Sequence, residues 1–77
     1  MPYFELIDEE KNSKKFWEIE EYNSENKYIV RYGKIGNAGI SKEFKFPKNE
    51  KGIAYRKKEV NKLIETKINK GYQQEVS

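Results

Sequence analysis

One stretch of the chain carries residue types that could bind an anion: VRYGKIGNAGIS, from Val30 to Ser41. Glycines stand at positions 33, 36 and 39, and cationic residues stand at positions 31 and 34. Backbone N–H groups in glycine-rich loops can cradle phosphates, and lysine or arginine can neutralise them. The same glycines could instead form a tight turn between two strands, where positive φ is required.

The spacing of these glycines favours the turn. A Walker phosphate loop needs Lys-Ser or Lys-Thr after its last glycine and a helix that begins there, whereas here a strand pattern follows. The GxxG loop of KH domains joins two helices, and this stretch lies between strands. Gly36, Asn37 and Gly39 are therefore the expected turn residues. Gly33 interrupts a strand pattern, which is typical of a bulge or of close approach by another group.

The charge of the 77-residue chain is unevenly distributed along its length. Residues 1–30 contain eight acidic residues and four lysines, a net charge of −4. Residues 31–77 contain twelve lysines or arginines and five glutamates, a net charge of +7. Such asymmetry favours a polyanionic partner for the basic half, whereas the alternative explanation is that lysine runs simply occupy solvated faces. Only clustering of these cations in space would separate the two explanations.

The composition also excludes several kinds of chemistry. The chain contains neither cysteine nor histidine, so disulfides, thiolate or imidazole metal sites and Ser-His or Cys-His nucleophiles are impossible. Glu18 and Glu20 share one strand face, but without further ligands they are better explained as a solvated face. We expect no enzyme, no cofactor and no bound metal.

The same features indicate where the chain works. The N-terminal MPYFELIDEE lacks the basic region and the apolar run of a signal peptide, and no apolar run approaches membrane-spanning length. A domain without cysteine fits the reducing cytosol. We therefore expect a cytoplasmic protein with no membrane partner.

Hydrophobic periodicity predicts four strands and one helix. The strand patterns cover residues 3–7, 15–22, 28–35 and 40–46, with polar connections at 8–13 and 23–26. Asn49 is a candidate N-cap for a helix over residues 50–69, and Gly71 is a candidate stop. The tail 73–77 is expected to fray. The predicted apolar stripe of the helix consists of Ile53, Val60, Leu63, Ile64 and Ile68.

These elements predict a single α+β domain over residues 1–77, in which one C-terminal helix packs on one face of a four-stranded antiparallel sheet. The first strand and a polar turn occupy 1–13, a three-stranded meander 14–47, the helix 49–70 and the tail 71–77. Since the helix covers one face, the other face or an edge of the sheet is free to meet a partner.

Several segments, taken in order, resemble a known family. They are KFWEI at 15–19, VRYGKIGNAG at 30–39, Phe44 and Phe46, and Lys67 followed by KGY at 70–72. Over residues 14–72 the chain resembles the WGR domain, named for a Trp-Gly-Arg tripeptide. This domain occurs in DNA-dependent poly(ADP-ribose) polymerases and in many bacterial proteins, sometimes nearly alone. The resemblance implies a twisted antiparallel sheet with a helix on one side.

The name-giving tripeptide is replaced here by Tyr32-Gly33-Lys34. In the polymerases its tryptophan packs against a sugar or base at a DNA end, and its arginine supports DNA contact and signalling between domains. Tyr32 retains a stacking face of smaller area, and Lys34 can neutralise a phosphate but lacks the planar fork for bidentate contacts. Backbone binding survives this change better than recognition of DNA ends. The polymerases' catalytic domain has no counterpart in the sequence, so ADP-ribosyl transfer is not implied.

We therefore predict a non-catalytic module that binds nucleic acid with weak to moderate affinity, with DNA favoured over RNA. Strand alternation places Arg31 and Lys34 on opposite faces unless a bulge at Gly33 brings them together, and Tyr28 is expected in the core. The alternative function is a protein–protein interaction module that contacts a separate chain or a second copy. The predicted nucleic-acid-binding residues are Arg31, Tyr32, Gly33, Lys34, Lys42 and Lys45.

Overall fold

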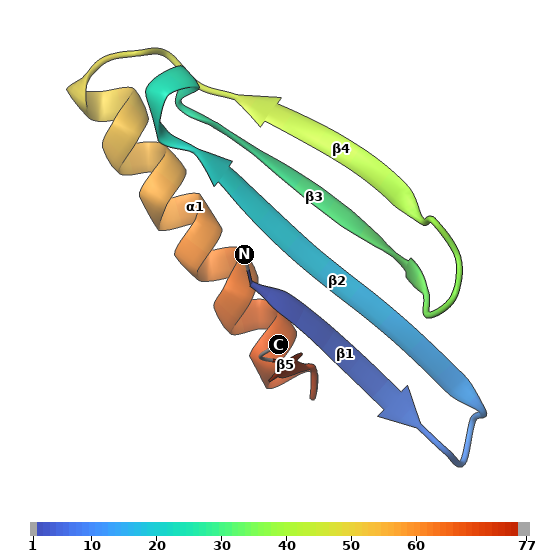
Figure 1. The fold of residues 1–77 in the computed structure, drawn as a ribbon. Helices are drawn as coiled ribbons and strands as arrows, with labels where there is room; N and C mark the ends of the chain where they lie inside the picture. Colours follow the sequence, from blue (N-terminus) through green and yellow to red (C-terminus); the bar gives the residue numbers. More distant parts are fainter. Residues whose placement is uncertain (1, 76–77) are drawn as a thin grey trace.

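The computed structural model of the protein describes residues 2–75 and shows a helix packed against one face of an antiparallel sheet (Figure 1). The strands run in the spatial order β4-β3-β2-β1-β5. In chain order the elements are β1 (Tyr3–Asp8), β2 (Ser13–Tyr22), the 3₁₀ turn η1 (Asn23–Glu25), β3 (Lys27–Lys34), β4 (Ile40–Lys45), α1 (Glu50–Asn69) and β5 (Gln73–Glu75).

The sheet has five strands, so the prediction of four strands and of a frayed tail over 73–75 is wrong. β5 pairs antiparallel with β1, with Gln74 opposite Phe4. The polar QQE sequence of β5 has no apolar alternation and gives no strand signal. Its pairing comes from the end of α1, which turns the chain toward the free edge of β1. Residues 76 and 77 of the predicted tail lie outside the described residues.

The two ends of α1 are fixed by side-chain and backbone hydrogen bonds. At its N-terminus the Asn49 side chain accepts a hydrogen bond from the Gly52 N–H at 2.7 Å, as the sequence predicts. At its C-terminus Gly71 takes a φ of 103°, and the Tyr72 N–H donates to the Lys67 carbonyl at 3.0 Å. This is a Schellman ending, which reverses the chain and folds Tyr72 back onto the core.

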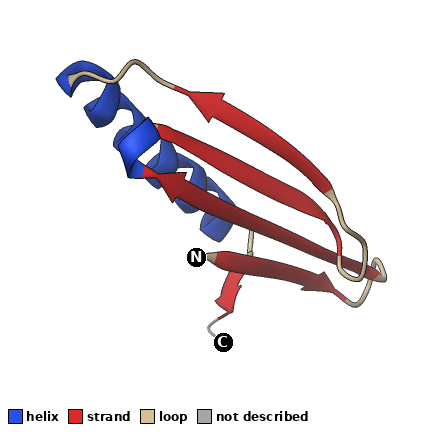
Figure 2. Ribbon diagram, turned by 45° about the horizontal axis from the view of Figure 1, so that its top comes forward, coloured by secondary structure: helices blue, strands red, loops and turns tan. Residues whose placement is uncertain are grey.

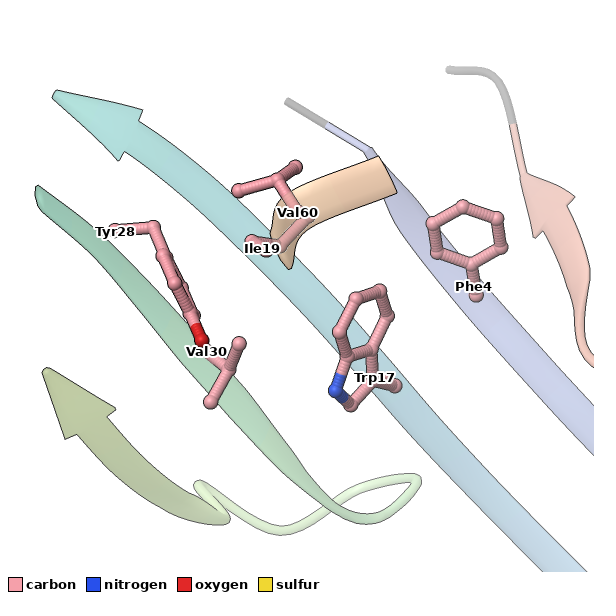
Figure 3. Packing of buried hydrophobic residues seen from close by; sticks show 6 residues of the cluster. All are labelled: Phe4, Trp17, Ile19, Tyr28, Val30 and Val60. Atoms are coloured by element: carbon pink, nitrogen blue, oxygen red, sulfur yellow. The ribbon is translucent and has the colours of Figure 1, made fainter. Parts of the chain in front are cut away.

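The core lies between the sheet and the middle of α1 (Figure 3). Val60 is buried, and Leu63 and Ile64 pack beside it, as the predicted stripe requires. Ile53 and Ile68 are instead 38% and 53% exposed, so the stripe is wrong at its two ends. Only the middle of the helix therefore contributes apolar side chains to the core. The core residues are Phe4, Trp17, Ile19, Tyr28, Val30 and Val60.

Within residues 2–75, no helix covers the opposite face of the sheet (Figure 2). Strand alternation assigns Trp17, Val30 and Tyr32 to the helix-bearing face, because Trp17 is paired with Tyr32 and Val30 with Ile19. Arg31 and its partner Glu18 point to the uncovered face. No helix within residues 2–75 is both long and apolar enough to cross a membrane.

Candidate nucleic-acid interface

The glycine stretch forms the hairpin between β3 and β4. Gly36 and Gly39 take φ values of 101° and 78°, which side-chain-bearing residues rarely adopt. A Cβ on Gly39 would lie 2.5 Å from the Tyr32 carbonyl oxygen and 2.7 Å from the Phe16 ring. A Cβ on Gly33 would lie 2.9 Å from the Gly39 Cα. Gly33 and Gly39 therefore let the two arms of the hairpin close against each other and against Phe16.

The pairing of β2 with β3 is regular through Gly33, with no bulge. Phe16 faces Gly33, and Glu18 faces Arg31 two residues further along. Consequently Arg31 and Lys34 project from opposite faces of β3. The six predicted binding residues do not form one platform, because the two faces of the sheet divide them.

On the uncovered face, Arg31 and Lys45 are engaged within the fold. Arg31 forms a salt bridge with Glu18, donates a hydrogen bond to the Ala38 carbonyl at 2.6 Å, and lies 4.6 Å from the Phe16 ring centroid. The Lys45 ammonium lies 3.4 Å from the Glu43 carboxylate. The contacts of Arg31 secure the hairpin, whereas the Lys45 pair, whose lysine side chain is 74% exposed, contributes little.

On the helix-bearing face, Tyr32, Lys34 and Lys42 lie together. The Lys42 ammonium is 5.9 Å from the Tyr32 ring centroid. Tyr32 is half-buried beside the core, and Lys34 is exposed. This side of the hairpin therefore keeps an aromatic ring beside two cations.

A cavity of about 290 Å³ opens between this side of β3 and the C-terminal end of α1. We call it the basic cavity, because three lysines lie at its edge. Lys15 lies opposite Lys34 in the sheet, and Lys67 reaches over from the helix. The residues that line the basic cavity are Lys15, Phe16, Tyr32, Gly33, Lys34, Lys67 and Tyr72.

A second cavity of about 330 Å³ adjoins it, and Tyr32 and Lys67 line both. We call it the aromatic cavity. Trp17, Tyr28 and Val30 are buried at its floor, whereas Phe44 is 41% exposed at its rim. The residues that line the aromatic cavity are Trp17, Tyr28, Val30, Tyr32, Phe44, Leu63 and Lys67.

Lys67 is the cation that joins the two cavities. Its ammonium lies 5.6 Å from the Trp17 ring centroid and 5.4 Å from the Tyr72 ring centroid. Burial, together with the neighbouring charges of Lys70 and Lys15, lowers the pKa of Lys67. Within residues 2–75, none of the three lysines of the basic cavity (Lys15, Lys34 and Lys67) forms a salt bridge with a carboxylate. Their concentrated positive charge would be relieved by an anion.

Five residues beside this side of the hairpin are not among the site residues predicted from the sequence: Lys15, Trp17, Lys67, Lys70 and Tyr72. All five lie in segments that contribute to the family resemblance, namely KFWEI at 15–19, Lys67 and KGY at 70–72, and that resemblance is the one signal that could have indicated them. Lys15 and Trp17 come from β2, Lys67 from α1, and Tyr72 from the chain reversal at Gly71. Local sequence patterns do not reveal that these segments meet beside the hairpin.

Glu18 lies on the uncovered face and accepts from Arg31, as described above. Among the residues that the structure describes, no group of three or more acidic, cysteine or histidine side chains is placed to hold a metal ion.

Comparison with known proteins assigns the chain to a family. The family model of the WGR domain matches residues 1–77. A search of curated proteins found no match. A crystal structure of a Bacteroides fragilis protein is similar to this chain, with 31% sequence identity and a TM-score of 0.81. The similarity covers 97% of this chain but 19% of the Bacteroides protein, so this chain corresponds to one part of that longer protein. Because the family model spans its whole length, the chain belongs to the WGR domain family.

Proposed function

We propose that the protein is a non-catalytic module that binds nucleic acid through the helix-bearing side of its glycine hairpin. WGR domains of poly(ADP-ribose) polymerases bind nucleic acid, and the family is non-catalytic. The observation that carries the proposal is the convergence of Lys15, Lys34 and Lys67 on one aromatic-lined cavity without carboxylate partners among residues 2–75.

The chemistry of this surface suits a phosphate backbone. Lysines in a row neutralise successive phosphates and release counterions, which gives affinity without sequence information. The half-buried Tyr32 ring beside Lys42 and Lys34 offers a face for a sugar or base. Of the six residues predicted from the sequence, we keep Tyr32, Gly33, Lys34 and Lys42 in the proposed site and add Lys15, Lys67, Lys70 and Tyr72.

The salt dependence of binding tests this proposal. If the five lysines of the proposed site each neutralise one phosphate of a duplex, the logarithm of the binding constant should fall with the logarithm of salt concentration with a slope of about −4.5. We expect a slope of this size for a short DNA duplex between 50 and 200 mM salt, measured by fluorescence anisotropy. Undetectable binding at 50 mM salt would remove the proposal.

A matched pair of variants locates the surface. Lys34→Ala should weaken binding about tenfold at 50 mM salt and reduce the magnitude of the slope by about 0.9. Lys45→Ala removes the same charge from the opposite face of the same hairpin and should leave binding unchanged. A larger loss in Lys45→Ala than in Lys34→Ala would place the contact on the uncovered face instead.

The type of nucleic acid and the cellular location are also part of the proposal. We favour DNA over RNA and a cytoplasmic location, on the family resemblance and on the lack of cysteine respectively. The alternative function, protein interaction, is supported by the uncovered sheet face, where Glu18, Glu20, Tyr22 and Ile29 line a third cavity of about 290 Å³.

A further inference from the structure

Phosphate binding at the basic cavity leaves the aromatic cavity unexplained. Its floor is made of core side chains, Trp17 and Tyr28, on the neighbouring strands β2 and β3 (Figure 3). Phe44 from β4 stacks on Tyr28, with ring centroids 5.0 Å apart and planes 23° apart. Leu63 closes the helix side. The cavity is thus an apolar site lined by aromatic rings, and its volume of about 330 Å³ is at the small end of ligand sites.

The two cavities together have the layout of one nucleotide unit. Tyr32 and Lys67 line both, so a phosphate held by the lysines of the basic cavity lies directly beside an apolar, aromatic space. In a nucleic-acid strand each phosphate is likewise followed, one sugar away, by a flat aromatic base.

We propose that the aromatic cavity receives an unpaired base of a nucleic-acid strand whose phosphates lie in the basic cavity. This inference rests on the proposed function and adds a substrate class to it: strands with unpaired nucleotides, such as a single-stranded extension beside a duplex. A paired base is stacked on both sides and hydrogen-bonded to its partner, so it would enter only after unstacking and unpairing, which cost a few kcal/mol.

The lining also predicts which property of the base is recognised. Aromatic and aliphatic side chains dominate it, and Lys67 is its one charged member. Stacking on aromatic rings accepts any base, because every base has a π-face. The cavity therefore selects unpaired over paired nucleotides and discriminates little among the four bases.

The test compares three DNA probes that share one duplex. The first is blunt, the second has a three-nucleotide single-stranded extension, and the third has the same extension with abasic residues. We expect the intact extension to raise affinity at least about fivefold over the blunt duplex, and the abasic extension to lose most of that gain. An abasic extension that binds as well as the intact one would overturn the inference, because phosphates alone would then account for the gain.

Two single substitutions on β4 form a matched pair for the same test. Phe44→Ala removes a wall of the cavity, whereas Ile40→Ala removes an apolar side chain that is 58% exposed on the same face of β4 and outside the cavity. We expect Phe44→Ala to abolish the gain from the extension and Ile40→Ala to keep it. The abasic probe needs no variant, so the inference stays testable if Phe44→Ala fails to fold.

The outcomes separate this inference from the proposed function. Equal affinity for blunt and extended duplexes, with both weakened by Lys34→Ala, would overturn the base site and leave nucleic-acid binding intact. Competition by a free nucleoside monophosphate would overturn it as well, if the monophosphate displaced the labelled probe at concentrations as low as those of the unlabelled extended strand. The cavity would then be a site for a mononucleotide. Absence of binding to all three probes would overturn both.

Discussion

Arg56 provides the sharpest test of how this small domain is held together. Its side chain is 1% exposed in the first half of α1. The guanidinium donates to the Asn26 side-chain oxygen at 2.6 Å and to the Asn23 side-chain oxygen at 2.9 Å, and it forms a salt bridge with Glu21. It thus connects the helix to the connection between β2 and β3. Arg56→Met keeps most of the aliphatic stem and removes all of these bonds.

The expected cost follows from what each partner loses. Asn26 is 1% exposed, so its side-chain oxygen would lose its buried donor, which costs about 1–3 kcal/mol. The Glu21 side chain is 39% exposed and can be solvated by water, so the loss of its salt bridge adds little. The substitution also removes the cost of burying a charge, which offsets part of the loss. We expect a net loss of about 2 kcal/mol in the free energy of unfolding.

For a domain of this size, a loss of about 2 kcal/mol corresponds to a melting temperature lowered by about 8–16 °C. Thermal and urea unfolding followed by circular dichroism would measure it. Lys57→Met is the control, because the neighbouring side chain is exposed and the same residue is introduced. If Arg56→Met melts within 4 °C of the parent protein, the guanidinium does not secure the turn and the reasoning fails.

Three further predictions concern the site and its supports. Because its surroundings lower the pKa of Lys67, DNA affinity should begin to fall at a lower pH in the parent protein than in Lys67→Arg when the pH is raised toward 10. The free energy of unfolding should rise over the same pH interval, because the folded state favours the neutral amine. Parallel curves of affinity against pH for the two proteins would contradict this. Gly39→Ala should cost at least about 2 kcal/mol in chemical denaturation, because its Cβ would collide with the Tyr32 carbonyl at positive φ. Asn49→Ala should lower the free energy of unfolding by about 1 kcal/mol, because the Gly52 N–H loses its side-chain acceptor. Asn49→Asp keeps an acceptor at this position and should lower the free energy of unfolding far less in the same assay.

The sequence predicted those parts of the fold that local periodicity determines. Alternation identified β1 to β4 and placed Tyr32 and Arg31 on opposite faces, and the asparagine cap and glycine stop identified α1. β5 escaped prediction because its three polar residues are ordered by pairing with β1. Arg56 escaped because a charged residue on a helix is expected at the surface, and its burial depends on amide partners 30 and 33 residues away.

The candidate site was predicted in part for the same reason. Tyr32, Lys34 and Lys42 belong to one hairpin, so their shared face follows from alternation once no bulge interrupts β3. The contribution of Lys15 comes from a neighbouring strand, and that of Lys67 from a helix more than thirty residues later. Tertiary packing brings these two lysines beside the hairpin, so local patterns along the sequence cannot predict that they share one site.

The two faces of the sheet use positive charge in different ways, and this difference is the strongest reason to regard the helix-bearing side as the binding surface. On the uncovered face Lys27, Arg31 and Lys45 each lie beside a carboxylate, and the pairs of the less exposed Lys27 and Arg31 help to stabilise the fold. On the helix-bearing side Lys67 is partly buried among other lysines, and its lowered pKa shows that the folded state disfavours its charge. Lys67 contacts the Trp17 and Tyr72 rings but has no carboxylate partner among residues 2–75, so an anionic ligand beside it would convert the cost of its charge into affinity. Replacing the Lys67 ammonium with a neutral group should therefore lower affinity more than it lowers stability, whereas substitution of Arg31 on the uncovered face should lower stability alone.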